Sequence, residues 1–162
     1  MDALAQVLAA NGHASVRTYI QTGNIEFRHP GSDASDLSAR ITKAIADQFG
    51  LQPTTIVFPH SRLRRAILGM LFSDLEDRNS VETLHIFFLA SAPESPDLER
   101  LYQLRAAHER FHHGHEVACL HAPSGFGRSR LAGAVERVLG VSVTARNWRT
   151  VTASDALATA DE

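Results

Sequence analysis

The sequence has little cysteine, little lysine, few aromatic residues and no long apolar stretch. Cys119 is the only cysteine among the 162 residues, which excludes an internal disulfide and a zinc site made of thiolates alone. The apolar run 86–90 is far shorter than the ~20 residues that cross a bilayer. The first residues, Met1-Asp2-Ala3, lack the positive charge of a signal peptide. These absences predict a globular, cytoplasmic protein without a membrane partner.

The chain also lacks a large excess of charge of either sign. The chain has 18 acidic and 16 basic residues and a net charge of −2, so electrostatics does not favour nucleic-acid binding. All basic residues except Lys43 are arginines. A guanidinium pairs well with phosphate or carboxylate, but a biased codon usage also enriches arginine. We therefore count only clustered arginines as evidence for an anion site.

Apolar spacing in the first half predicts alternating helices and strands. Residues 1–10 form a helical stripe that ends at Asn11-Gly12, and residues 37–49 form another that ends at Gly50. Between them, residues 16–27 fit either a tight hairpin or one strand broken by a bulge. Residues 54–58 are expected to form a strand, followed by a helix capped by Ser61.

The second half repeats this order. Residues 84–90 read as a strand covered on both faces, and Ser95-Pro96 reads as the start of a helix. A strand over 116–121 and a helix capped by Ser129 follow, and an acid-rich tail over 155–162 is expected to fray. Short connections between alternating elements predict an α/β or α+β fold with helices packed on a sheet.

Three segments resemble blocks of one bacterial family. Residues 16–27 read VRTYIQTGNIEF, similar to VRTYIQSGNVVF; residues 125–131 read GFGRSRL, similar to GIGRSKL; residues 144–151 read TARNWRTV, similar to TARNWNTV. The family is catalogued as domain of unknown function 1697, and the likeness runs from about Met1 to Val151. It implies an α+β fold of two ferredoxin-like halves, residues 1–80 and 81–162, and no established activity.

The family begins with a strand and a glycine-rich turn of the type YVALLRGINVGG, and this chain starts at the helix that follows them. The first strand of a ferredoxin-like half lies inside its sheet, so its loss leaves backbone groups without partners. An open edge of this kind recruits other chains. We therefore expect Met1 to be an internal methionine, and a homodimer to form through the open sheet edge if the chain exists as it stands.

The loop Gly125–Arg130 is the strongest candidate for a binding site. Gly125 and Gly127 allow a tight turn with exposed amides, and Ser129 is expected at a helix N-terminus, where the dipole favours an anion. Arg128 and Arg130 add positive charge. The competing interpretation is an ordinary strand-to-helix connection with a serine cap, because Gly-x-Gly alone is a weak motif.

Two further groups are candidate ligand contacts. Arg146, Asn147 and Trp148 offer charge, a donor–acceptor amide and a stacking face, although Trp148 could equally anchor the C-terminal segment while Asn147 caps a helix. Thr22 and Asn24 flank Gly23, and this trio fits turn chemistry better than binding.

Residues 108–112 spell H-E-x-x-H, which on one helix would place two imidazoles on zinc. Nine histidines make a chance match more frequent, and the resemblance places residues 111–113 in a strand, so no metal site is assigned. Cys119 is interpreted as a small buried side chain rather than a nucleophile.

We expect the protein to bind a small anionic ligand, a nucleotide or a phosphorylated metabolite, near Arg128, Ser129, Arg146 and Trp148. The alternative is a nucleic-acid-binding module that stacks bases on Tyr19, Phe27 and Trp148, against which the net charge counts. A zinc hydrolase is the third hypothesis. Whether a reaction follows stays open, since no catalytic residue stands out, and no cofactor is predicted.

Overall fold

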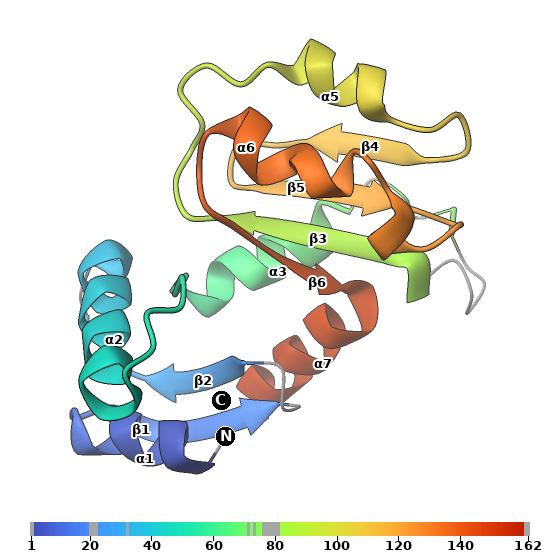
Figure 1. Cartoon of the computed structure of the whole chain (residues 1–162). Helices are drawn as coiled ribbons and strands as arrows, with labels where there is room; N and C mark the ends of the chain where they lie inside the picture. Colours follow the sequence, from blue (N-terminus) through green and yellow to red (C-terminus); the bar gives the residue numbers. More distant parts are fainter. Residues whose placement is uncertain are drawn as a thin grey trace. The chain divides into compact units, whose positions relative to one another are not determined.

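The computed structural model describes residues 2–19, 23–31, 33–70, 72, 74–75 and 82–160, which form an α+β fold with two antiparallel sheets (Figure 1). The chain divides into two compact units. One comprises residues 1–59 together with 154–162, and the other comprises residues 60–153.

The first unit is built on a β-hairpin between two helices. Its elements are α1 (Asp2–Ala10), β1 (Ala14–Tyr19), β2 (Asn24–Arg28) and α2 (Ala34–Phe49). β1 and β2 pair antiparallel, with Arg17 opposite Glu26, so the hairpin alternative is the correct one. The register shifts between Ala14 and Arg17, where Ser15 adopts a φ of 52°.

Both ends of α2 are capped by side-chain and backbone chemistry that the sequence encodes. The Asp33 carboxylate accepts from the Ser35 amide at 2.7 Å, which satisfies a free N–H of the first turn. Gly50 ends the helix in the left-handed region with a φ of 67°, as predicted.

The strand predicted over residues 54–58 is wrong, because no strand is present there. The backbone N–H of Val57 donates instead to the Ser38 hydroxyl on α2, at 3.0 Å. The Val57 side chain still packs against the apolar cluster of Leu8, Ile41 and Ile45. The β-branched residues of 54–58 thus form a segment that packs against helices. Such a segment shows the same apolar pattern as a strand.

The second unit has the strand order of a ferredoxin-like half. Its sheet contains β3 (Leu84–Leu89), β4 (Arg110–His113), β5 (Val117–His121) and β6 (Val143–Asn147), in the antiparallel order β4-β5-β3-β6. The helices α5 (Leu98–Leu104) and α6 (Val135–Leu139) follow β3 and β5. The unit also includes α3 (His60–Leu68) and the beginning of α7 (Trp148–Thr159).

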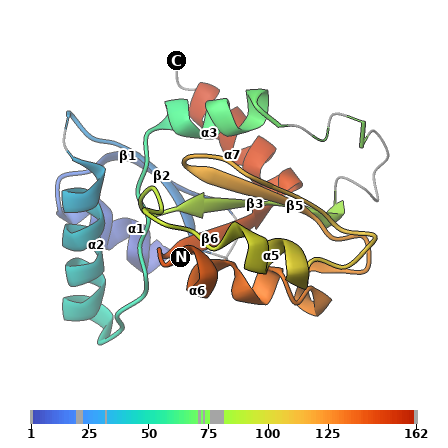
Figure 2. The same ribbon diagram turned by 90° about the horizontal axis from the view of Figure 1, so that it is seen from above.

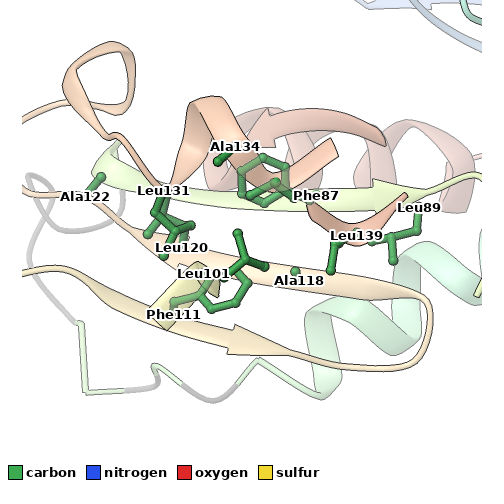
Figure 3. Packing of buried hydrophobic residues seen from close by; sticks show 11 residues of the cluster. Phe87, Leu89, Leu101, Phe111, Ala118, Leu120, Ala122, Leu131, Ala134 and Leu139 are labelled. Carbon is green, nitrogen blue, oxygen red and sulfur yellow. The ribbon is translucent and has the colours of Figure 1, made fainter. Parts of the chain in front are cut away.

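β3 lies inside the sheet and is covered on both faces, as its continuous apolar run predicts. Phe87 and Leu89 point toward α5 and α6, where they pack with Leu101, Leu120 and Leu131 (Figure 3). Seen from above, α3 lies on the other side of β3 from α5 (Figure 2). Each full burial of such a side chain contributes about 1.5–3 kcal/mol, so this sheet is the stable centre of the unit.

Four details of the helices differ from expectation. α3 begins at His60, so Ser61 lies inside the helix and is not its cap. Asp97, not Ser95, caps α5, and its carboxylate accepts from the Arg100 amide at 2.9 Å. The helix expected after Ser129 is divided into a 3-10 turn, η2 (Ala132–Ala134), and the five residues of α6. The tail expected to fray from residue 155 is helical as far as Thr159.

Within the described ranges, no helix has the length and apolarity that crossing a membrane requires.

Candidate functional site

The loop after β5 is anchored to the sheet by an aromatic contact. It contains the 3-10 turn η1 (Phe126–Arg128), which begins after Gly125. Gly125 has a φ of 101°, a conformation that side-chain-bearing residues rarely adopt. The Phe126 ring stacks on His85 of β3 with 4.2 Å between ring centroids. This stacking fixes the loop above the beginning of the central strand.

Backbone hydrogen bonds within the loop use several of the amides that were expected to face a ligand. The N–H groups of Gly125, Arg128 and Ser129 donate to the carbonyls of Ala122, Gly125 and Phe126 at 2.9, 3.1 and 3.1 Å. The Ser129 hydroxyl accepts from the amide of Ala132, the first residue of η2, at 3.1 Å. The prediction that the loop amides are free for a ligand is therefore wrong for these three N–H groups. Side chains must supply most of the groups that would bind an anion.

A cavity of about 150 Å³ lies between this loop and the connection from α5 to β4. Four predicted site residues line it: Gly125, Arg128, Ser129 and Arg130. The remaining lining residues are Leu104, Ala106, His108, Glu109 and Ser124. Gly127, also predicted, belongs to η1 but is not among the lining residues.

Arg128 and Arg130 are exposed at this cavity. Within the part of the chain that the structure describes, neither guanidinium has a carboxylate partner. Arg110 of the same unit, in contrast, contacts the Asp74 carboxylate at 2.7 Å. Two cations without acidic partners at one cavity can bind an incoming anion without first breaking an ion pair.

Glu109 contributes a buried carboxylate to the same cavity. The residue is 4% exposed, and its Oε2 accepts from the Ala106 amide at 2.9 Å. Arg105 donates to the Glu109 backbone carbonyl. These two bonds hold the turn between α5 and β4 in place, with Glu109 against the cavity.

The H-E-x-x-H string does not lie on a helix. This agrees with the strand that the resemblance implies for residues 111–113. α5 ends at Leu104, His108 lies in a turn, and residues 110–113 form β4. Its two histidines therefore share no helical face. Among the described residues, no group of three or more His, Cys, Asp or Glu side chains could hold a metal ion. Sequence reasoning missed that His108 and Glu109 line the cavity, because only the pairing of β4 with β5 brings these segments together.

Arg146, Asn147 and Trp148 do not line the cavity. Arg146 lies on β6 opposite Ile86, and its Nη1 donates to the Thr144 hydroxyl at 2.6 Å and the Ala145 carbonyl at 2.8 Å. Burial lowers the pKa of this guanidinium. Because side chains alternate along a strand, Arg146 points away from the sheet face on which Ala145 and Phe87 pack with α5 and α6.

The other two residues of this group have structural positions. Asn147 Oδ1 accepts from the Thr150 amide at 2.8 Å, which makes Asn147 the cap of α7. Trp148 is the first residue of that helix and is half-buried. Of the remaining candidates, Thr22 lies outside the described residues, and Asn24 begins β2 opposite Tyr19.

One known protein family matches most of the chain. Residues 1–118 match the family described as "Protein of unknown function (DUF1697)". The chain belongs to this family. No curated protein and no solved structure matches the chain. The DUF1697 match ends before the loop at 125–130 and before the block at 144–151, so these two segments lie beyond the matched residues.

Cys119 is an unreactive position in this DUF1697 chain. It lies on β5 and is 4% exposed, and burial raises the pKa of its thiol to about 11. A thiol with that pKa is almost entirely protonated at neutral pH, so it does not act as a nucleophile. This agrees with its interpretation as a small buried side chain.

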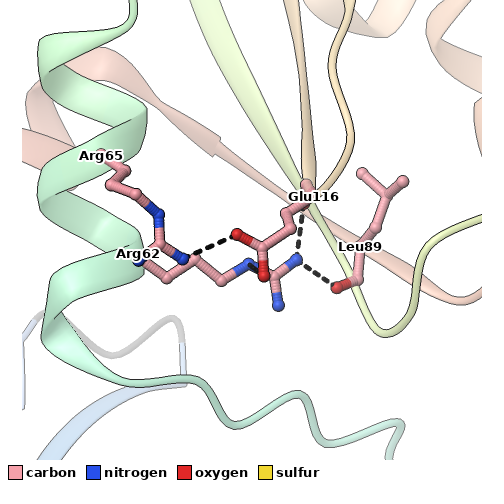
Figure 4. Close-up of polar contacts among 4 residues, drawn as sticks. All are labelled: Arg62, Arg65, Leu89 and Glu116. Atoms are coloured by element: carbon pink, nitrogen blue, oxygen red, sulfur yellow. Dashed lines mark hydrogen bonds and ion pairs between the residues drawn. The ribbon is translucent and has the colours of Figure 1, made fainter.

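A second polar cluster in the same unit was not predicted, and it is structural. Arg62 on α3 is 8% exposed, and its Nη2 donates to the carbonyls of Leu89 and Glu116 at 2.5 Å each (Figure 4). Arg65, one turn later, contacts the Glu116 carboxylate at 2.8 Å and lowers its pKa. The cluster ties α3 to the end of β3 and to the connection between β4 and β5.

Proposed function

We propose that the cavity beside residues 124–130 binds a small anionic ligand, such as a nucleotide or a phosphorylated metabolite. The observation that carries the proposal is the pair of exposed guanidinium groups, Arg128 and Arg130, at a cavity that also includes Gly125 and Ser129. Arginine presents donors in a planar fork that matches the oxygens of phosphate and carboxylate. These two side chains are the groups that would hold the anion.

The size of the cavity limits which part of a ligand enters it. Its volume of about 150 Å³ is below the ~300–1,000 Å³ of pockets that enclose whole drug-sized ligands. A phosphate or carboxylate group with a few attached atoms fits this volume. Any larger part of a nucleotide would lie outside the cavity, against solvent-exposed residues.

Calorimetry with inorganic phosphate and adenosine monophosphate tests this function, and a thermal-shift screen of phosphorylated metabolites extends it. Arg128→Ala should weaken binding about 10- to 150-fold, because charge-assisted hydrogen bonds contribute about 1.5–3 kcal/mol. Arg137→Ala is the matched control, since Arg137 is exposed on α6 and does not line the cavity. Failure of every phosphorylated probe to bind at millimolar concentration would exclude the proposed site.

The nucleic-acid alternative has no observation in its favour. Phe27 packs against the apolar cluster of the first unit, and the His13 ring lies 4.5 Å from its ring centroid. Phe27 therefore does not offer a free face for a base. The net charge of −2 also counts against binding to a polyanion.

A zinc hydrolase is not proposed either, because its two histidines share no helical face. Dimerisation through the edge of the two-stranded sheet and a cytoplasmic location stay predictions. Sedimentation velocity at several concentrations tests the first, and fractionation of the native host tests the second.

A further inference from the structure

The cavity holds charges of both signs that do not neutralise each other. Arg128 and Arg130 are exposed at it, whereas Glu109 is 4% exposed and lines it from the turn before β4. Across the described ranges, no ion pair joins Glu109 to either arginine. The two signs of charge therefore remain available to two different groups of one ligand.

The Glu109 carboxylate has more acceptor capacity than its known contact uses. An ionised carboxylate offers about four lone-pair positions on two oxygens. The Ala106 amide occupies one of them, at Oε2. A buried carboxylate without a cationic partner is unfavourable, so a positively charged donor that enters the cavity gains from contact with it.

We propose that the ligand of this cavity is a phosphorylated amine, whose phosphate contacts Arg128 and Arg130 and whose ammonium contacts Glu109. This inference rests on the proposed function, since it names the ligand class of the same site. The small cavity favours a short compound in which few atoms separate the two groups. A purely anionic ligand would leave the Glu109 carboxylate without a cationic contact and would bring a second negative charge into the same cavity.

Two probes that differ only in the amine separate this inference from the proposed function. Phosphoethanolamine and ethyl phosphate carry the same phosphate on a two-carbon chain, and only the first carries an ammonium. Calorimetry on the whole chain at pH 7 should show that phosphoethanolamine binds at least ~10-fold more tightly. Glu109→Gln should remove this preference and leave the affinity for ethyl phosphate equal or higher.

The control for that substitution is Glu136→Gln, an exposed acid on α6 that does not line the cavity. It should leave both affinities unchanged. Equal affinity of the unaltered protein for the two probes would overturn the inference and leave the proposed function intact. Binding of neither probe would overturn both. The comparison on the unaltered protein decides the matter even if Glu109→Gln fails to fold.

Discussion

At the scale of single residues, the same side-chain type has different roles that depend on its partners. Arg128 and Arg130 are exposed beside a cavity, whereas Arg62 and Arg146 are held by carbonyl or hydroxyl oxygens. The held arginines satisfy backbone groups, which stabilises the sheet and its connections. Arg128 and Arg130 are exposed together at one cavity, which is why the anion site is assigned to that pair.

Replacement of Arg62 should be the most destabilising arginine substitution in the second unit. Arg62→Ala leaves the carbonyls of Leu89 and Glu116 without a buried donor, at a cost of about 2–4 kcal/mol in the free energy of unfolding. Arg65→Ala is the matched control. Arg65 is 61% exposed, so its ion pair with Glu116 contributes about 0–1 kcal/mol. Denaturant titration measures both; equal losses would contradict the structural role of Arg62.

Cys119 should react slowly with thiol reagents while the protein is folded. Its pKa of about 11 and its burial suppress the thiolate, so at pH 8 we expect reaction with a soluble disulfide reagent to be at least ~100-fold slower than in the denatured chain. The denatured protein is the internal control for reagent and thiol content. A native rate near that of a free thiol would show that β5 opens readily.

At the scale of elements, the loop 125–130 depends on one glycine more than on the other. Gly125 has a φ of 101°, so Gly125→Ala should cost about 1–3 kcal/mol in stability and weaken phosphate binding by moving Arg128. Gly127 has no such φ, and an added Cβ there meets no atom within 4 Å, so Gly127→Ala should be close to neutral. Thermal unfolding and phosphate calorimetry on both variants check this. Equal effects would mean that the loop is not held in the observed conformation.

Two histidines flank the hairpin of the first unit, the buried His13 before β1 and the half-buried His29 after β2. The centroids of the His13 and His29 rings lie 5.0 Å apart, and the buried Nδ1 atoms of both have no hydrogen-bond partner among the described residues. Burial is the main cause that lowers the pKa of His13, and the charges of His29 and Arg40 add to it. The folded hairpin therefore favours the neutral form of His13.

At the scale of the whole molecule, histidines with lowered pKa values in both units should make the protein acid-labile. Burial lowers the pKa values of His13, His85 and His113 below 6.5, so the unfolded chain binds more protons than the folded chain. The free energy of unfolding should thus fall as pH drops below 6.5, by at most ~1.4 kcal/mol per pH unit for each histidine.

Denaturant titrations at pH 7, 6 and 5 measure this slope. His13→Leu should reduce it, because leucine cannot bind a proton. His108→Ala is the control, since His108 is exposed and is not among the charges that act on His13, His85 or His113. A free energy of unfolding that is constant from pH 7 to pH 5 would contradict the prediction.

Local patterns along the chain determined much of the fold. The apolar stripe of residues 37–49 predicted α2, and Gly50 and Gly140 predicted the ends of α2 and α6. The continuous apolar run of β3 predicted a strand that is covered on both faces. Helix periodicity and caps depend on residues only a few positions apart, so one sequence suffices to find them. The clustering of Arg128, Ser129 and Arg130 was visible for the same reason.

Only the tertiary structure decided which segments meet. It placed Val57 on helices rather than in a strand, and it directed Arg146 to the sheet face opposite the one that packs on α5 and α6. It also brought Glu109 to the loop at 125–130, although the two are far apart in sequence. A period-2 pattern does not say which face a strand buries or which strand lies beside it, because both depend on the register between distant segments. The sequence by itself therefore determined the α+β elements and the arginine loop, whereas the pairing of β4 with β5 determined the cavity.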